Sequence, residues 1–324
     1  MPVITFSPME NELRKDYFLD RRVIIAVGRG KRPSDFKRDP APEEDGKTCF
    51  FCPGNEEMTP AEISRVEEDG HWVIRVFPNK YPAVTTEEEE GSDELMPAYG
   101  YHEIVVENPA HSKSVSDLSI ERISHVLSVY NERVEHMLSD PRVRYALVFK
   151  NHGRKAGASL SHTHTQIIST PVVPRLVKEE AEAVERYKTL NGSCPLCDAW
   201  KKEVGGPRKV WEDYHMAVFT PYASRSPMEA WIVPKRHVHD LGDLSDEERH
   251  SMASAFKLLL EKLRDGLNDP PYNLYFHVNP RGADLHLHVE LLPRLSNWAG
   301  FELGSEIIIN TMAPEDAAEF YRPE

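Results

Sequence analysis

The most constraining feature of this sequence is an internal duplication, because one series of motifs occurs twice in the same order. Each copy runs from a Cys-x-x-Cys pair through a strand-like segment, a single histidine, a helical segment and a second strand to a His-x-His pair. We expect such a chain to fold as two similar halves. The pairs are Cys49/Cys52 with His162/His164 in the first copy, and Cys194/Cys197 with His286/His288 in the second.

The segments between these motifs predict the secondary structure. Apolar residues that follow Ser119 and Ser245 have the 3.6-residue spacing of amphipathic helices. Four runs are rich in strand-forming residues, at 102–107, 145–150, 229–233 and 272–277. We predict an α+β fold of two tandem halves, at residues 1–187 and 188–324, each a mainly antiparallel sheet with packed helices.

The composition is that of a globular protein, with 40% hydrophobic and 28% charged residues among 324. The net charge of −14 argues against a general nucleic-acid-binding protein. No apolar run is long enough to span a bilayer, and the first residues lack the basic and long apolar regions of a signal peptide. We therefore expect a cytoplasmic protein without a membrane or nucleic-acid partner.

The four cysteines occur as two pairs, which in a cytosolic chain favours metal or redox chemistry over structural disulfides. Pro53, Gly54 and Pro195 favour tight metal knuckles. Zinc takes four sulfur or nitrogen ligands in a tetrahedron, and a site closed by four protein ligands is structural. The first half offers Cys49, Cys52, His111 and one histidine of its pair; the second offers Cys194, Cys197, His237 and one of its pair.

A different metal site is possible in the second half. Glu180, His277, His286 and His288 could hold iron or zinc through a carboxylate-containing set. His286 belongs to either set, so both sets cannot be fully occupied. We favour the cysteine-containing set, with His286, because thiolates bind zinc more tightly than a carboxylate does.

The histidine that is not a metal ligand is free for chemistry, and in the first half this is His164. An extended backbone would carry His162, His164 and Gln166 on one face. The small-residue loop from Gly157 to Ser159 can bring backbone N–H groups to a phosphate. The Gln166 carboxamide can donate to a phosphate oxygen but cannot act as acid or base. Together these residues suit a histidine that attacks phosphorus.

A basic segment, residues 21–38, stands out in this acidic chain and includes Arg29 and Arg32. Two interpretations stay open. One is a solvated loop; the other is a phosphate-binding arm, because guanidinium groups match phosphate oxygens in pairs.

Several short motifs, spread over nearly the whole chain, resemble those of one family, the galactose-1-phosphate uridylyltransferase branch of the histidine-triad superfamily. They are His162-Thr-His-Thr-Gln166, Arg29-Gly-Lys-Arg-Pro33, Phe77-Pro-Asn-Lys-Tyr-Pro82, Asn108-Pro-Ala-His-Ser112, Pro234-Lys-Arg-His237 and Gly300-Phe-Glu302. The resemblance implies histidine-triad-like halves and a double displacement. His164 would attack the α-phosphorus of a nucleoside-diphosphate sugar, release sugar 1-phosphate and pass the nucleotide to a second phosphate substrate.

The resemblance also implies roles for other residues. Gln166 would hold the α-phosphoryl group, and the first zinc set would be Cys49, Cys52, His111 and His162. Nucleotide and phosphate contacts would come from Arg29, Arg32, Asn79, Asn151 and Ser159. Phe301 and Glu302 match a segment that reaches the sugar site of the other subunit, which implies a homodimer.

The sequence departs from the family at Thr163, where many members have proline, and at Thr165, often glycine. The expected reaction is UDP-glucose + galactose 1-phosphate = glucose 1-phosphate + UDP-galactose. The alternative is a phosphorylase of ADP-glucose or a dinucleoside polyphosphate, because the segment after Gly300 also resembles the adenylyl-sugar phosphorylase branch. Weaker alternatives are a nucleotide hydrolase, which in this superfamily carries histidine at the position of Gln166, and a non-catalytic zinc-stapled module.

Overall fold

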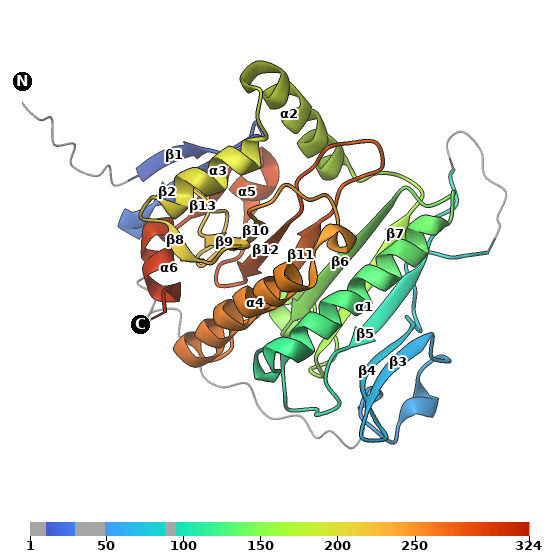
Figure 1. The fold of residues 1–324 in the computed structure, drawn as a ribbon. Coiled ribbons are helices and arrows are strands. Elements are labelled where there is room, and N and C mark those ends of the chain that lie inside the picture. Colours follow the sequence, from blue (N-terminus) through green and yellow to red (C-terminus); the bar gives the residue numbers. More distant parts are fainter. Residues whose placement is uncertain (1–10, 30–48, 88–94, 324) are drawn as a thin grey trace, which may run out of the picture.

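The computed structural model describes residues 11–29, 49–87 and 95–323, and it confirms the α+β prediction (Figure 1). A ten-stranded antiparallel sheet forms its centre. The first half contributes β3 (Ser64–Glu68), β4 (His71–Pro78), β5 (His102–Val106), β6 (Tyr145–His152) and β7 (His164–Thr170). The second contributes β8 (Lys209–Glu212), β9 (Met216–Phe219), β10 (Ala230–Pro234), β11 (Tyr272–His277) and β12 (His288–Pro293).

The strand order shows the duplication directly. It runs β3-β4-β5-β7-β6 and continues β11-β12-β10-β9-β8, so each half has the same order counted from its outer edge. The halves join where β6 pairs antiparallel with β11, with Asn151 opposite Asn273. Because the sheet is continuous, both halves share one large apolar core. Residue 187, where we place the boundary, lies within helix α2 (Arg175–Asn191), and the boundary stays a prediction.

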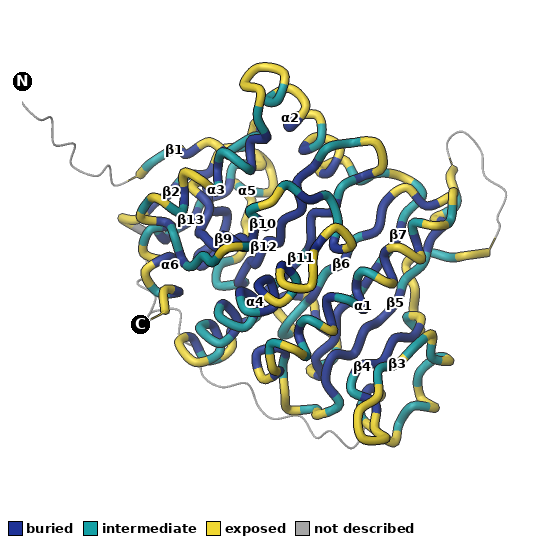
Figure 2. Tube along the Cα trace, viewed as in Figure 1, coloured by how far each residue is buried: buried dark blue, intermediate teal, exposed yellow. Residues whose placement is uncertain are grey.

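Two long helices, α1 (Ile120–Ser139) and α4 (Asp246–Leu267), cover one face of this sheet (Figures 1 and 2). Both begin where the sequence predicts. Ser119 and Ser245 cap the helices by accepting the backbone N–H three residues on, each at 3.2 Å. Each helix packs its apolar stripe into the core that it shares with the sheet, and the buried residues of both helices appear as dark-blue stretches in Figure 2.

The opposite face is covered by shorter segments. In the second half α3 (Pro195–Val204) packs on β8 and β9, and its Leu196 belongs to the same buried apolar cluster as Trp231 of β10. In the first half the segment around Phe51 packs on Phe77 of β4. The two Cys-x-x-Cys pairs therefore lie on the same face of the sheet, away from α1 and α4.

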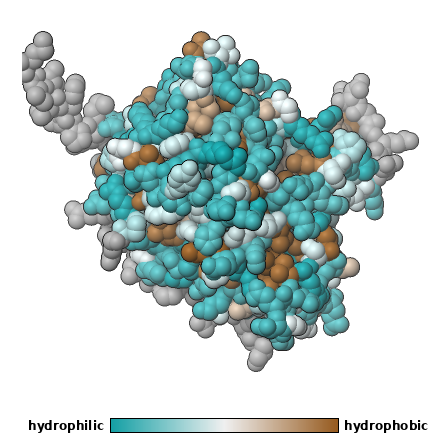
Figure 3. Space-filling view, viewed as in Figure 1, coloured by the Kyte–Doolittle hydropathy of each residue, from teal (hydrophilic) through white to brown (hydrophobic). Residues whose placement is uncertain are grey.

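The remaining elements flank the second half. A small sheet has the order β1-β2-β13, from β1 (Asn11–Lys15), β2 (Arg22–Ala26) and β13 (Ile308–Asn310). The last helices are α5 (Gly300–Ser305) and α6 (Pro314–Tyr321). The face seen in Figure 3 is mostly hydrophilic, with scattered apolar patches. Within the described residues, no helix has both the length and the apolar character needed to span a membrane.

Candidate active site and metal centres

His164 is the first residue of β7, and its imidazole is buried. Its Nδ1 lies 2.8 Å from the backbone oxygen of His162. A carbonyl oxygen only accepts, so Nδ1 carries the hydrogen, and Nε2 of the neutral ring keeps its lone pair. Burial lowers the pKa of His164, which favours this neutral form. The ring therefore offers an unprotonated nitrogen suited to nucleophilic attack.

The strand begins at His164, two residues later than an extended backbone through His162 would require. His162 lies in a bend before β7, and the regular alternation starts at His164. Along β7, Thr165 contacts Tyr130 of α1, so its side chain points to the helix-covered face. His164 and Gln166 consequently point to the opposite face, which also carries the cysteines.

Gln166 meets a residue that the sequence did not indicate. Its Oε1 lies 2.8 Å from Nε2 of His102, the first residue of the neighbouring strand β5. The same ring nitrogen lies 3.2 Å from Nδ2 of Asn79. Thus Asn79 and Gln166, predicted from different motifs, come together at His102.

A buried ionic network lies beneath the strand that carries His164. The Lys150 ammonium donates to Glu107 at 2.8 Å, to Thr163 Oγ1 at 2.8 Å and to the His164 backbone oxygen at 2.9 Å. Glu107 also accepts from the hydroxyls of Thr163 and Thr165. Burial disfavours the ionised carboxylate, but the Lys150 charge and these hydrogen bonds outweigh it and lower the pKa of Glu107. Both threonines that depart from the family pattern are partners of this network.

The first predicted metal set gathers its ligand atoms within 4.8 Å of one another: Cys49, Cys52, His111 and His162. His162 Nδ1 lies 3.5 Å from both sulfurs, and His111 Nδ1 lies 3.4 Å from Cys52 Sγ. The opposite ring nitrogens are held by the Asn108 backbone oxygen at 2.7 Å and by Ser161 Oγ at 3.3 Å. Burial lowers the pKa of His162 to about 4, so its Nδ1 is free of a proton.

The second predicted set gathers in the same way: Cys194, Cys197, His237 and His286. Cys197 Sγ lies 3.6 Å from His237 Nδ1 and 3.5 Å from His286 Nδ1. Cys194 occupies the N-cap position of α3 and Cys197 lies in its first turn, so this pair is part of a helix and not a free-standing knuckle. His237 Nε2 is 2.9 Å from Asp284 Oδ1, and His286 Nε2 is 3.1 Å from the Arg236 backbone oxygen.

Both clusters suit zinc. Tetrahedral Zn–S and Zn–N bonds of about 2.3 and 2.0–2.1 Å imply sulfur–nitrogen separations of about 3.5 Å. The separations above, 3.4–3.6 Å, match that value, and Cys194 Sγ lies somewhat farther from His286 Nδ1, at 4.0 Å. In every predicted zinc histidine Nδ1 faces sulfur while Nε2 contacts an acceptor, which is the usual outer-shell arrangement of metal-bound imidazole.

The alternative set of Glu180, His277, His286 and His288 does not form one site. Both nitrogens of His286 are engaged, one toward the cysteines and the other by Arg236, so it is unavailable to this set. His277 Nδ1 instead contacts Glu180 at 2.8 Å. Burial lowers the pKa of His277, but the charges of Glu180 and Glu290 outweigh it and raise the pKa to about 10. His277 and His288 group with Glu290 in the buried interior.

The remaining predicted substrate residues that the structure describes lie in three places. Asn151 on β6 accepts a hydrogen bond from Asn273 at 2.8 Å and lies beside Gly157. Gly157 has a φ of +93°, a backbone conformation that would be strained for a residue with a side chain. Ser159, two residues further along the chain, is exposed. Phe301 and Glu302 lie on α5, beside the small sheet and remote from β7 in Figure 1. Arg29 ends a short 3-10 helix, Val27–Arg29, and Arg32 lies outside the described residues.

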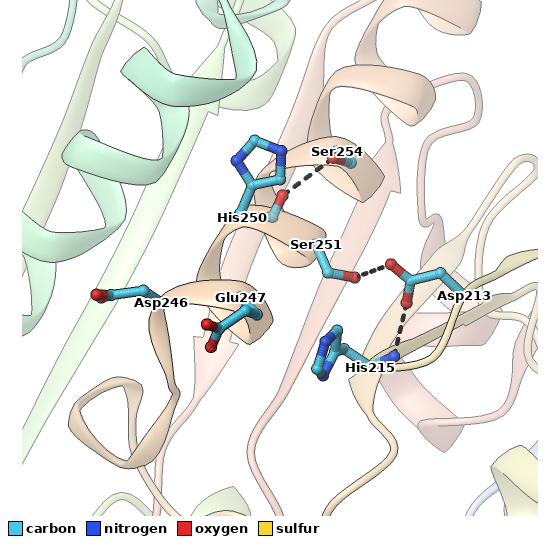
Figure 4. A pocket seen from close by; sticks show the side chains of 7 residues that line it. All are labelled: Asp213, His215, Asp246, Glu247, His250, Ser251 and Ser254. Carbon is cyan, nitrogen blue, oxygen red and sulfur yellow. Dashed lines mark hydrogen bonds between the residues drawn. The ribbon is translucent and has the colours of Figure 1, made fainter.

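A surface pocket of about 430 Å³ lies elsewhere, between the start of α4 and the turn from β8 to β9 (Figure 4). Asp213 accepts from Ser251 there and from the backbone N–H of His215. The pocket contains none of the predicted catalytic residues. It is lined by Asp213, His215, Asp246, Glu247, His250, Ser251 and Ser254.

Comparisons with known proteins identify the family. A family model described as galactose-1-phosphate uridyl transferase, N-terminal domain, matches residues 5–174. The chain belongs to the galactose-1-phosphate uridylyltransferase family. A second model, for a domain of unknown function, matches residues 107–321.

Relatives of this uridylyltransferase family member match over almost its whole length. ADP-glucose phosphorylase of Arabidopsis thaliana is 36% identical over 96% of this chain and 92% of its own. Galactose-1-phosphate uridylyltransferase of Haemophilus influenzae is 30% identical over 98% of this chain and 95% of its own. The crystal structure of an A. thaliana ADP-glucose phosphorylase with bound ADP-glucose has a TM-score of 0.85 and 33% identity, and covers 97% of this chain and 99% of that one.

Within this uridylyltransferase fold, the sequence missed His102, Glu107 and Lys150. The two charged residues look like surface residues in a sequence, since lysine and glutamate are seldom buried. Only the departures at Thr163 and Thr165 signalled a polar network under the motif. The roles of the predicted site residues stay predictions.

Proposed function

We propose that the chain is an enzyme that transfers a nucleotidyl group through a covalent intermediate on His164, exchanging sugar 1-phosphates on a nucleoside-diphosphate sugar. The observation that carries this proposal is the 2.8 Å hydrogen bond from His164 Nδ1 to the His162 carbonyl oxygen. It fixes the tautomer that leaves Nε2 as the nucleophile.

In the first step His164 Nε2 attacks the α-phosphorus. The N–P bond forms, the bond from phosphorus to the bridging oxygen breaks, and sugar 1-phosphate leaves with the electron pair. In the second step a phosphate oxygen of the acceptor attacks the same phosphorus, and Nε2 leaves. While phosphorus is attached the ring is cationic, and the His162 carbonyl oxygen stabilises this charge through Nδ1–H.

Gln166 would donate to the phosphoryl oxygens from its amide nitrogen. A carboxamide cannot remove a proton from water, so this side chain gives no base catalysis of hydrolysis. That chemistry favours transfer to a phosphate acceptor over loss of the nucleotide to solvent.

We assign the reaction to the first half because the equivalent position in the second half is closed. His288 begins β12 as His164 begins β7, and its Nδ1 donates to the His286 oxygen at 2.9 Å. However, the His288 ring is fully buried, with the His277 ring stacked on it at 4.3 Å and Trp231 beside it at 5.2 Å between ring centroids. Glu290 stands where the first half has Gln166, and a carboxylate would repel a phosphoryl group.

For the substrates we propose UDP-glucose and galactose 1-phosphate, on the strength of the uridylyltransferase relatives. The second candidate is phosphorolysis of ADP-glucose through the same histidine. It is favoured by the 36% identity with the A. thaliana ADP-glucose phosphorylase.

We further propose zinc in both Cys2His2 clusters, where it would crosslink each Cys-x-x-Cys segment to the sheet. With four protein ligands, each ion would have no coordination position left for substrate. We also propose a homodimer in the cytoplasm. Phe301 is 49% exposed on α5, which suits a side chain that reaches the sugar site of a second copy.

Intact-mass spectrometry tests the proposal. The protein is incubated without acceptor with UDP-glucose, UDP-galactose or ADP-glucose, and we expect one nucleotidyl adduct that maps to His164. Adding galactose 1-phosphate or inorganic phosphate to the isolated adduct then identifies the acceptor that discharges it. An intact protein with no adduct from any donor would overturn the proposed function.

A further inference from the structure

The contact between His102 and Gln166 has a definite direction. Nδ1 of His102 lies 3.2 Å from the backbone N–H of Ala83, and a backbone N–H can only donate. Nδ1 must therefore hold the lone pair, and Nε2 carries the hydrogen. The 2.8 Å bond consequently runs from His102 Nε2–H to Gln166 Oε1.

The direction of this hydrogen bond fixes the orientation of the Gln166 carboxamide. With Oε1 held by His102, the amide NH2 is on the other side of the group, and only N–H donors face away from the ring. An inverted carboxamide would present its oxygen instead, and oxygen repels the anionic oxygens of a phosphoryl group.

The orientation of the Asn79 amide is fixed in a similar way. Its Oδ1 accepts from the Tyr81 backbone N–H at 2.9 Å, so its NH2 faces the region of His102. Because His102 Nε2 carries a hydrogen, the 3.2 Å contact of Asn79 Nδ2 with that nitrogen is not a hydrogen bond. The Asn79 amide hydrogens thus remain available to a ligand.

We propose that His102 is a positioning residue that holds the Gln166 carboxamide with its NH2 toward the phosphoryl group on His164. This inference rests on the proposed function. His102 would not touch the reacting atoms; it would act through Gln166, and it would be needed in the neutral Nε2–H form. Burial lowers the pKa of His102, in agreement with that form.

The test compares His102→Met with His102→Gln. Methionine fills similar space without a donor, whereas glutamine keeps an N–H that can reach Gln166. For His102→Met we expect kcat for nucleotidyl transfer to fall about 10- to 100-fold, as for a misplaced catalytic group, with little change in KM. His102→Gln should recover most of this loss. The exposed His125 on α1 provides a matched control, and His125→Met should retain full activity.

Two measurements separate this role from a merely structural one. Long-range proton–nitrogen correlation spectra should show His102 as the Nε2–H tautomer, with its signal assigned by its loss in His102→Gln. Equal damage by the Met and Gln variants, an unchanged kcat in His102→Met, or an Nδ1–H tautomer would each overturn the inference. Wild-type protein that forms no nucleotidyl adduct would instead mark failure of the proposed function.

Discussion

Removing Lys150 should destabilise the protein far more than removing an ordinary surface lysine. Its ammonium is buried with the Glu107 carboxylate at 2.8 Å, and neither group reaches solvent. In Lys150→Met the carboxylate keeps its hydroxyl partners Thr163, Thr165 and Tyr130 but loses its counter-charge. Breaking a buried pair in this way costs about 3–5 kcal/mol. The entropy of unfolding is about 2.1 cal/mol/K per residue, which for 324 residues predicts a fall in Tm of about 4–7 °C.

The assay is thermal unfolding at equal zinc content, followed by circular dichroism, for Lys150→Met, Glu107→Leu and the double variant. Replacing both partners removes the unpaired charge, so the double variant should recover much of the loss of the single variants. Lys178→Met, at an exposed position of α2, should change stability by no more than about 0.5 kcal/mol. Single variants as stable as this control, or losses that simply add in the double variant, would refute the reasoning.

Three further predictions address the nucleophile, the second predicted metal cluster and one half-buried acid. His164→Gly should abolish adduct formation while the zinc content and Tm stay near wild type; near-full transfer would rule out His164 as nucleophile. Asp284→Asn should weaken zinc binding by the second cluster about 10- to 100-fold, because Asp284 holds Nε2 of His237 at 2.9 Å. Competition with a chelating dye should show one zinc ion per chain bound with lower affinity and one with unchanged affinity. Burial raises the pKa of Asp240 to about 6, so the stability it contributes is full below its ordinary pKa of 3.8 and is lost as pH rises through 6. At pH 7 the free energy of unfolding of Asp240→Asn should thus exceed that of wild type by about 1–2 kcal/mol, after discounting for the partial exposure of the side chain. Near pH 4 the two proteins should be equally stable. Equal stability gains at both pH values would contradict this prediction.

The sequence predicted those parts of the fold that local periodicity determines. Ser119 and Ser245 marked the starts of α1 and α4 because an N-cap and a 3.6-residue pattern are local signals. The four strand-like runs became β5, β6, β10 and β11 for the same reason. The cysteine and histidine spacing predicted both Cys2His2 clusters, because the two copies of the duplication carry the same set of ligand residues.

What the sequence could not show depends on contacts between distant segments. His102 meets Gln166 because β5 pairs with β7, and this pairing is a property of the strand order rather than of either segment. The choice between the two metal sets in the second half required the orientation of His286, since the residue types alone allowed both. Arg32 lies outside the described residues, so its phosphate-binding role stays a prediction.

The duplication also explains how one half can be committed to chemistry and the other to structure. Both halves keep the backbone pattern in which the second histidine of the pair donates Nδ1–H to the first, at 2.8 Å in one and 2.9 Å in the other. In the second half Arg225 pairs with Glu290, and this buried pair occupies the position that corresponds to Gln166. A single change of Glu290 to glutamine would leave the Arg225 charge with fewer partners and would not open the cover formed by Trp231. We therefore expect Glu290→Gln to lower stability without creating a second adduct site, because access and charge would both have to change before His288 could act as a nucleophile.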